Sequence, residues 1–238
     1  MNDSLALNAR PLAGKVEKRT KASLLEESIR RDIISGRLVP GEKLRLKDLA
    51  EYYQAGQIPL REALSRLAAS GFVRAQDQRG FQVVPVSREE IIDITRVRGL
   101  LECEALADSI ANGDVTWESR IVEAHYRLER LPVLDSETGM LNAAWESAHV
   151  AFHNALLAAC SSPLLLKYCA ELRDQTARYR SLSAKYAVAD KRDIPMEHSQ
   201  LMEAALRRDT VKAARLLTLH YEKTTASLLG ADVTSEPG

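Results

Sequence analysis

The sequence predicts a mainly α-helical protein built from two domains, and three observations lead to this fold class. The chain has 238 residues, 45% of them hydrophobic and 28% charged, a balance typical of globular proteins. Apolar residues recur at helical spacing over most of the chain, and only residues 72–85 alternate as short strands do. Residues 1–87 carry 15 Lys and Arg against 10 Asp and Glu, whereas residues 88–238 carry 18 against 23. A basic first part joined to an acidic second part is either an ordinary fluctuation of surface charge or the mark of a nucleic-acid-binding domain.

The first part of the chain predicts a helix-turn-helix. Residues 1–15 are expected to be a disordered tail. Residues 16–35 place apolar side chains at helical spacing and end at a Ser-Gly pair, a typical helix stop. Shorter helices are expected over residues 46–53 and 58–70, with a tight, glycine-containing turn between them. Two short helices joined in this way form the helix-turn-helix pattern.

A β-hairpin is expected directly after the second short helix. Gly71 stops that helix, and residues 72–75 and 81–85 are predicted to be short strands around the polar turn 76–80. A hairpin in this position is the wing of a winged helix-turn-helix. Residues 16–86 are therefore predicted to form a winged helix-turn-helix domain.

The rest of the chain predicts a bundle of about six helices. Ser87 and Glu90 form a capping box, so a new helix is expected to start at residue 88. Helical periodicity then continues to about residue 229, with breaks near residues 113, 131–136, 161–163, 188–195 and 209. We expect an all-α antiparallel helical bundle over residues 87–230 and a disordered tail over 231–238.

No segment has the pattern of an export signal or a membrane span. The N-terminus lacks an apolar stretch of signal-peptide length, and no run approaches the ~18 apolar residues that cross a bilayer. We therefore expect a cytoplasmic protein with no membrane partner. Cys103, Cys160 and Cys169 lack CxxC spacing and follow apolar helical patterns, so we expect three buried, reduced thiols.

The helix-turn-helix carries residues suited to DNA. In such domains the N-terminal residues of one helix reach base edges in the major groove, while a neighbouring helix and the wing hold phosphates. Arg pairs with guanine and Gln with adenine, although both also bond phosphate. The alternative is that Arg61 and its neighbours form only a solvated helix face. The candidate DNA contacts are Arg45, Lys47, Gln57, Ile58, Pro59, Arg61, Arg79 and Gly80.

These residues lie in segments that resemble the DNA-binding domain of the GntR family. The resemblance covers about residues 18–86 and rests on ISGRLVPGEKL from residue 34, on PLREALSRLAASGFV from residue 59, and on Arg79-Gly80. It implies a homodimer that binds a palindromic operator. The chain departs from the family pattern at residues 54–58, where QAGQI replaces the usual GVSRT and Gln57 stands in place of a DNA-reading arginine. This departure bears on the operator sequence more than on DNA binding, since Arg61 and the wing remain.

Four of the five histidines follow an ordered pattern. His149 and His153 are four residues apart and share one helix face, and His198 and His220 fall in two later helices. Imidazole nitrogens are natural ligands for a borderline cation such as Zn²⁺. The alternative is a set of ordinary buried or surface histidines, and we expect the fifth, His125, to lie at the surface.

The same region resembles the ligand-binding FCD domain of the FadR subfamily of GntR regulators. The resemblance implies a divalent-metal site made by Asp-x-x-x-His on one helix and a His on each of two later helices, matched here by His153, His198 and His220. The Asp position is His149 in this chain, and a fourth imidazole favours Zn²⁺ or Ni²⁺ over harder cations. The alternative is a three-histidine site from which His149 swings away.

The resemblance also implies a small carboxylate effector at the open coordination positions of the metal. Arg98, in a segment similar to the first helix of that domain, is the candidate for pairing with the carboxylate through its planar fork. Asn154 and Arg178 are further candidates. The alternative for Arg98 is an exposed ion pair with Glu102, four residues along the helix.

Two other functions remain open from the sequence. A metal-dependent hydrolase would use the histidines to activate water and Glu197 as a general base, but the chain has no HExxH, nucleophile elbow or glycine-rich phosphate loop. A regulator with a purely structural metal, enclosed by four histidines, would have no small effector. The favoured interpretation is a DNA-binding regulator, not an enzyme, with a metal- and effector-binding second domain.

Overall fold

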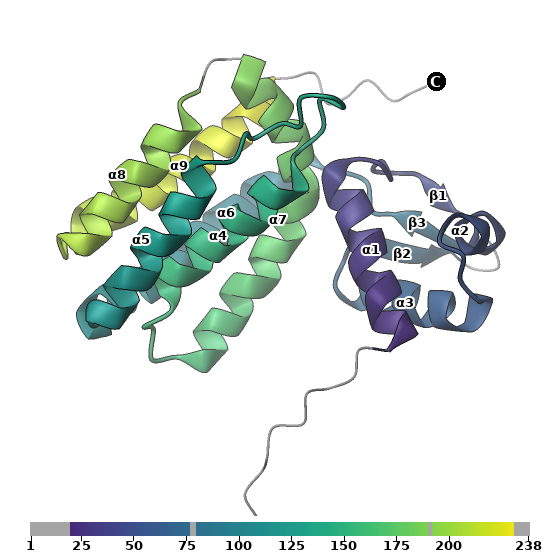
Figure 1. Cartoon of the computed structure of the whole chain (residues 1–238), viewed down its shortest axis with the longest axis horizontal. Helices are drawn as coiled ribbons and strands as arrows, with labels where there is room; N and C mark the ends of the chain where they lie inside the picture. Colours follow the sequence, from purple (N-terminus) through teal and green to yellow (C-terminus); the bar gives the residue numbers. More distant parts are fainter. Residues whose placement is uncertain (1–19, 77–79, 190–191, 231–238) are drawn as a thin grey trace, which may run out of the picture.

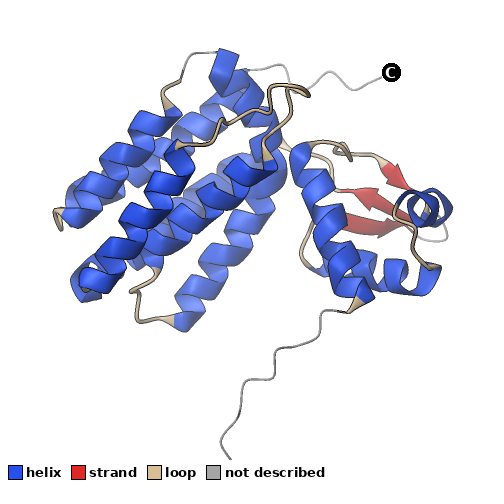
Figure 2. Cartoon of the chain, viewed as in Figure 1, coloured by secondary structure: helices blue, strands red, loops and turns tan. Residues whose placement is uncertain are grey.

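A small mixed domain and a larger helical domain lie side by side in the computed structural model, which describes residues 20–76, 80–189 and 192–230 (Figure 1). Helices dominate both domains, and the described strands all belong to the small one (Figure 2). The mainly α fold class is thereby confirmed. The tails expected over residues 1–15 and 231–238 lie outside the described residues.

The first domain consists of three helices and a small antiparallel sheet. Its elements are α1 (Lys21–Ser35), β1 (Lys43–Leu44), α2 (Leu46–Tyr52), α3 (Gln57–Ala69), β2 (Val73–Gln76) and β3 (Gly80–Val83). Strands β2 and β3 form the expected hairpin, with Arg74 opposite Gln82. Strand β1 was not predicted, and it pairs with β3 to give the order β1-β3-β2.

Local interactions delimit the helices of this domain. Thr20 Oγ1 accepts a hydrogen bond from the Ser23 backbone N–H at 3.2 Å, and Gly36, with φ of 81°, ends α1 in the left-handed conformation. Pro59 falls in the first turn of α3, where a missing N–H leaves no helical bond unmade. The buried core that joins α1, α3 and the sheet includes Ile29, Ile33, Leu60, Leu64, Leu67, Phe72 and Val83.

The second domain is a bundle of six described helices. They are α4 (Arg88–Asn112), α5 (Val115–Glu129), α6 (Ala143–Leu157), α7 (Pro163–Ala189), α8 (Ile194–Leu206) and α9 (Thr210–Gly230). Ser87 Oγ accepts a hydrogen bond from the Glu90 N–H at 3.2 Å, so the expected cap begins α4. None of the described helices is long and apolar enough to cross a membrane.

The bundle encloses its own apolar core, which includes Leu106, Trp117, Ile121, Phe152, Leu156, Leu201 and Leu217. Cys160 and Cys169 are buried free thiols, as expected. Cys103 is only partly buried, because it lies on the outer side of α4, where its Sγ meets the Thr218 hydroxyl at 3.4 Å. The expectation of full burial is wrong for this residue.

Helices α1 and α7 make the main contact between the two domains (Figure 1). Ala177 of α7 belongs to the buried core of the first domain, and Arg30 of α1 forms an ion pair with Asp174 of α7. Helix α7 therefore belongs to the packing of both domains.

Candidate metal centre and nucleic-acid interface

Four histidines from three helices converge inside the bundle. His149 and His153 lie one turn apart on α6, His198 comes from α8 and His220 from α9, and all four are buried. One potential ligand atom from each side chain lies within 4.8 Å of the corresponding atoms of the other three. These atoms are close enough together that small side-chain rotations would let one shared zinc ion lie ~2.0–2.1 Å from each nitrogen, the length of a zinc–nitrogen bond.

Three of these imidazoles have ring nitrogens with no hydrogen-bond partner among the described residues. The atoms are Nδ1 of His149, Nε2 of His153 and Nε2 of His198. A buried polar atom without a partner costs about 1–3 kcal/mol, so three at one point are unusual in a native core. A shared cation would satisfy all three, and the donor set therefore fits a metal ion.

The fourth imidazole is held from behind by a carboxylate. His220 Nδ1 lies 2.8 Å from Glu197 Oε2, which leaves Nε2 of the ring to face the other histidines. Glu197 in turn accepts a hydrogen bond from Arg192 Nε at 2.9 Å. A carboxylate in this position fixes the orientation of a ligating imidazole and raises its basicity.

The electrostatic surroundings keep these imidazoles neutral. Burial lowers the pKa of His149, of His153 and of His198 well below the ordinary value of a histidine. Positive charge on neighbouring groups adds to the shift, and at His198 the Glu197 carboxylate opposes it. Burial also lowers the pKa of His220, although Glu197 opposes the shift. Because a neutral imidazole is the form that binds metal, the four side chains are in the required protonation state at neutral pH.

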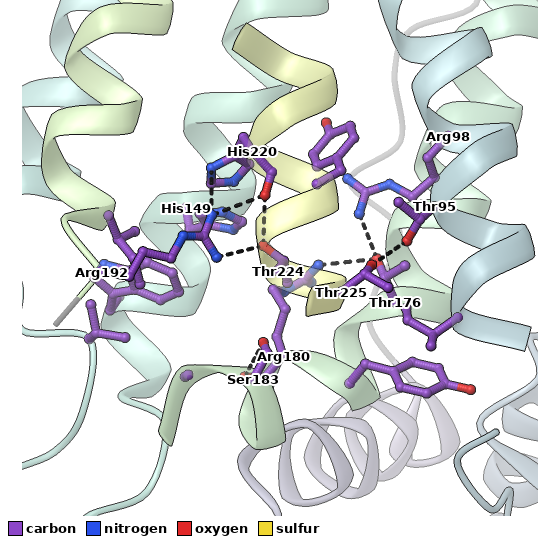
Figure 3. Close-up of a pocket in the computed structure, with 17 residues that line it drawn as sticks. Thr95, Arg98, His149, Thr176, Arg180, Ser183, Arg192, His220, Thr224 and Thr225 are labelled. Atoms are coloured by element: carbon purple, nitrogen blue, oxygen red, sulfur yellow. Dashed lines mark hydrogen bonds between the residues drawn. The ribbon is translucent and has the colours of Figure 1, made fainter. Parts of the chain in front are cut away.

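A small cavity opens beside the histidines, between α4, α6, α7, α8 and α9 (Figure 3). His149 and His220 line it, and Trp145 stacks on the His149 ring with centroids 4.7 Å apart. The free volume is about 50 Å³, whereas one water needs about 10–15 Å³ on the same measure. The cavity has room for a few waters or for a small polar group.

Arg98 lines this cavity, and it is also paired with Glu102. Its Nε donates to Glu102 Oε1 at 2.9 Å and its Nη1 to the Thr176 hydroxyl at 3.0 Å, while its guanidinium stacks 4.0 Å above the Tyr221 ring centroid. The predicted ion pair is present, but the prediction that it is exposed is wrong, because both side chains are buried. Arg98 is therefore held rigidly in the cavity wall.

The charges around the cavity leave a positive excess. Four guanidinium groups lie in or directly behind the wall, three carboxylates pair with them, and the more exposed Lys223 adds another cation beside Glu197. These pairs are Arg98 and Arg173 with Glu102, Arg180 with Glu146, and Arg192 with Glu197. Among the residues that the structure describes, these pairs leave at least one positive charge in excess, and a divalent ion on neutral imidazoles would add two more.

Two residues expected to bind the effector lie elsewhere. Asn154 is exposed on α6 and accepts a hydrogen bond from Arg173, so it does not line the cavity. Arg178 is buried, but on the opposite side of α7, where its Nη1 donates to the Gly71 carbonyl at 2.7 Å and it pairs with Glu90. The prediction that these two residues bind the effector is wrong for this cavity, because neither side chain lines it.

His125 also differs from expectation. It is buried rather than at the surface, because α5 turns it toward α8, and its Nε2 lies 3.1 Å from the Ser199 hydroxyl. It does not join the four clustered histidines.

Sequence reasoning missed two arginines of the cavity wall, Arg180 and Arg192 (Figure 3). A signal for Arg180 was present, since Thr176, Arg180 and Ser183 repeat at helical spacing on the inner face of α7. A polar stripe on a core-facing side of a helix indicates a polar cavity. Arg192 lies in a loop before α8, and no periodic pattern points to it.

The predicted DNA-reading residues gather at one edge of the first domain. Gln57, Ile58 and Arg61 are exposed on the first turns of α3, and the Ile58 side chain is 84% exposed. Arg45 and Lys47 are exposed at the start of α2. Among the described residues, none forms an ion pair with Arg45, Lys47 or Arg61, so their charges are available to phosphate.

Two more of the predicted DNA contacts, Pro59 and Gly80, lie at this edge. Pro59 is half-buried in the first turn of α3, and Gly80 begins β3 with φ of 92°, a conformation that favours glycine. Arg79, expected at the tip of the wing, lies outside the described residues. Arg66 is further along α3, but ion pairs with Glu62 and Glu26 tie it to the domain itself.

Residues 93–223 match the FCD domain, and residues 21–83 match the bacterial regulatory proteins of the gntR family. The chain is 40% identical over 207 residues to BphR of Paraburkholderia xenovorans, an uncharacterized HTH-type transcriptional regulator, with 84% of this chain and 83% of that protein covered. It is 36% identical over 198 residues to the HTH-type transcriptional repressor GlaR of Escherichia coli, with 81% and 88% covered. The solved structure of E. coli McbR shares the fold, with a TM-score of 0.70 at 21% identity over 89% of this chain and 98% of that one.

Proposed function

The chain belongs to the GntR family of bacterial transcriptional regulators and carries an FCD domain. We propose that this FCD domain binds one divalent metal ion and a small carboxylate, and that the two ligands together set the affinity for the operator. Its relatives and both of its domains make it a DNA-binding transcriptional regulator and not an enzyme. The hydrolase alternative is therefore wrong. The general-base role that this alternative gives to Glu197 is also disfavoured, because the carboxylate of Glu197 is already bound to Arg192 and His220.

The observation that carries the metal proposal is the cluster of four buried imidazoles, three of them with unpartnered ring nitrogens. An all-nitrogen donor set favours Zn²⁺ or Ni²⁺ over Mg²⁺ and Ca²⁺, which prefer oxygen ligands. His153, His198 and His220 form the minimal site. His149 either completes a tetrahedral set or leaves one coordination position open to the effector.

The cavity beside the histidines supports a small anionic effector. Its positive excess favours a carboxylate, and its small free volume favours a compact one. The guanidinium of Arg98 presents a planar donor fork, and His149 and His220 join the cavity to the metal site. A carboxylate bridging the ion and Arg98 would thus contact α4, α6, α8 and α9 together.

The DNA-binding function is assigned to the exposed start of α3, with α2 and the wing on the flanking phosphates. Because one such helix makes few base contacts, we propose that a homodimer binds a palindromic operator in the cytoplasm. The name of GlaR describes that relative as a repressor. Repression relieved by the carboxylate is the corresponding behaviour proposed for this chain.

A structural metal without any effector is the second candidate, because four histidines would close the coordination sphere. Thermal unfolding separates the two. The melting temperatures of zinc-loaded and of chelator-treated protein are measured in the presence of small mono- and dicarboxylates and of the matched neutral amides. We expect carboxylates, but not amides, to raise the melting temperature of the zinc-loaded form only. Stabilisation by zinc with no response to any carboxylate would support the structural metal, and no response to zinc would contradict the metal site.

A further inference from the structure

A buried ion pair separates the cavity beside the histidines from a second space between the two domains. Arg180 of α7 lines the cavity, and its Nε donates to both carboxylate oxygens of Glu146, at 3.0 and 2.9 Å. Glu146 lies in the first turn of α6 and lines the second space, an interdomain groove of about 470 Å³ between α1 and α6. The two partners of one ion pair thus border two different spaces.

Arg180 lies within reach of a carboxylate that is held by Arg98. Nη1 of Arg180 and Nη1 of Arg98 both donate to the Thr176 hydroxyl, at 3.3 and 3.0 Å (Figure 3). The two guanidinium groups therefore converge on one place in the cavity. A carboxylate offers two oxygens, and its hydrogen bonds to guanidinium groups are stronger than those of a neutral hydroxyl. The small anion of the proposed function can thus accept from Arg180 as well as from Arg98.

Such an anion competes with Glu146 for the guanidinium of Arg180. Bidentate binding of a carboxylate through Nη1 and Nη2 of Arg180 needs Nη2, which now donates to Glu146. Two carboxylates beside one guanidinium also repel each other. Glu146 is buried, and a buried carboxylate that loses its partner is destabilised unless another positive charge reaches it. Since Glu146 borders the interdomain groove, a rotation of its side chain leads there.

A positive charge is available across the interdomain groove. Arg31 of α1 lines the groove, is exposed, and donates from Nη2 to the Ser28 hydroxyl at 3.3 Å. Among the residues that the structure describes, none forms an ion pair with Arg31. The neighbouring Arg30 lines the same groove, but it is bound to Asp174. Arg31 is thus the charge with which a released Glu146 can pair.

Helix α1 connects this charge to the packing of the DNA-reading helix. Ile29 and Ile33 of α1 lie on either side of Arg31 in the sequence, and both belong to the buried core that contains Leu60 and Leu64 of α3. A contact between Arg31 and α6 therefore acts on the helix against which α3 packs. It favours the arrangement of the two domains in which it forms, at the expense of the arrangement that binds the operator.

We propose that the effector carboxylate takes Arg180 from Glu146, and that the released Glu146 pairs with Arg31 of α1 and thereby lowers operator affinity. One ion pair is exchanged for another, so Glu146 has a partner in both states. This inference rests on the proposed function, and it names the residues through which the carboxylate of that site acts on the DNA-binding domain.

A substitution that releases Glu146 without any effector tests this exchange. Operator affinity of the full chain is measured by fluorescence anisotropy with DNA that the parent selects from a random library. Arg180→Gln should lower this affinity about tenfold or more, because Glu146 loses its partner permanently. Adding Arg31→Gln should restore the affinity to within about threefold of the parent. Adding Arg127→Gln, the same substitution at an exposed arginine of α5, is the control and should restore nothing.

Folding and carboxylate binding of the Arg180 variants are measured in parallel. Melting temperature and zinc content establish that each variant is folded. If Arg180→Gln does not fold, Arg180→Lys, which keeps the charge but loses the planar fork, should lower operator affinity to a smaller extent, and Arg31→Gln should again restore it. The carboxylate that stabilises the zinc-loaded parent most strongly should bind the Arg180 variant about tenfold more weakly or worse.

Different results overturn different parts of the proposal. Parental operator affinity in a folded Arg180 variant would contradict the exchange. A loss of affinity that Arg31→Gln does not restore would show that Glu146 does not act through Arg31. Unchanged carboxylate binding in the Arg180 variant would remove Arg180 from the effector site. If no carboxylate stabilised the zinc-loaded parent, the proposed function itself would be contradicted, and this inference with it.

Discussion

Arg178 Nη1 donates a hydrogen bond to the backbone carbonyl of Gly71, 2.7 Å away, and thereby joins α7 of the bundle to the residue that follows the C-cap of α3. The next residue, Tyr179, lines the cavity, and its hydroxyl accepts from the Ser87 N–H at 3.1 Å in the segment between the domains. Ala177, one residue earlier, is buried in the core of the first domain. One turn of α7 thus contacts both the cavity beside the histidines and the first domain, so a shift of α7 would reach both.

This contact predicts that Arg178→Ala uncouples the two domains. The substitution removes the bond to Gly71 and leaves Glu90 without this ion-pair partner, a loss of about 1–3 kcal/mol at the interface. In scanning calorimetry we expect the parent to unfold in one transition that zinc raises as a whole. The variant should unfold in two transitions, and zinc should raise the melting temperature of the bundle transition only. Arg127→Ala is the surface control, and a single zinc-sensitive transition in Arg178→Ala would show that the link lies elsewhere.

The buried histidines predict a steep loss of stability in acid when the metal is removed. Their pKa is lowered in the folded protein but near 6.5 in the unfolded chain, so the unfolded state binds more protons as the pH falls below 6.5. Well below pH 6.5, each histidine reduces the free energy of unfolding by up to about 1.4 kcal/mol per pH unit, and the three with the lowest pKa together by up to about 4.

Urea titrations of chelator-treated protein at pH 7.5, 6.5 and 5.5 measure this slope. His153→Gln should reduce it by at most about one third, because one titrating group is removed while His220 and His125, whose pKa is also lowered, still contribute. An unfolding free energy that stayed constant between pH 6.5 and 5.5 would mean that these imidazoles are not buried in the metal-free protein.

Arg61 is predicted to contact the operator. Its side chain is exposed on the first turns of α3 and forms no ion pair with a described residue, so Arg61→Ala should weaken binding by about 1–3 kcal/mol if it reads a base. Loss of a phosphate contact alone would instead reduce the steepness of log K plotted against the logarithm of the salt concentration by about 0.9. Fluorescence anisotropy with an operator selected from a random library measures both. Binding and salt slope equal to the parent would place the reading surface elsewhere, and Arg127→Ala is the control.

Arg98→Lys is predicted to weaken binding of the effector without loss of the metal. Lysine keeps the charge but loses the planar fork, so the dissociation constant of the most strongly stabilising carboxylate should rise about tenfold or more while zinc content is unchanged. Arg173→Lys is a close control, because Arg173 binds the same Glu102 carboxylate at 3.0 Å but does not line the cavity. Equal effects of the two substitutions would assign Arg98 a structural role only.

The helices, the β2–β3 hairpin and the spacing of the four histidines could be predicted from the sequence, because they depend on local periodicity. His149 and His153 are one turn apart on one helix, and the helices that carry His198 and His220 have clear apolar faces. Helix breaks near residues 113 and 209 were equally local, and the structure places Gly113 and Asp209 between helices.

The errors concern side chains whose environment is set by packing between distant segments. Whether Arg178 faces the cavity or the first domain depends on how α7 docks against α1, which residue type and spacing do not reveal. His125 is buried because α8 and α6 both pack against α5. Strand β1 has two residues and exists through its pairing with β3, so it has no alternating pattern of its own.

Metal content of the purified chain tests the central claim most directly. After zinc loading and removal of unbound metal, mass spectrometry of the digested protein should find about one zinc per chain in the parent and in His125→Ala, whose histidine is buried outside the cluster. His198→Ala should lose most of the bound zinc, because it removes a ligand contributed by α8 alone. Equal zinc content in His198→Ala and in the parent, or none in the parent, would contradict a metal centre at the four histidines.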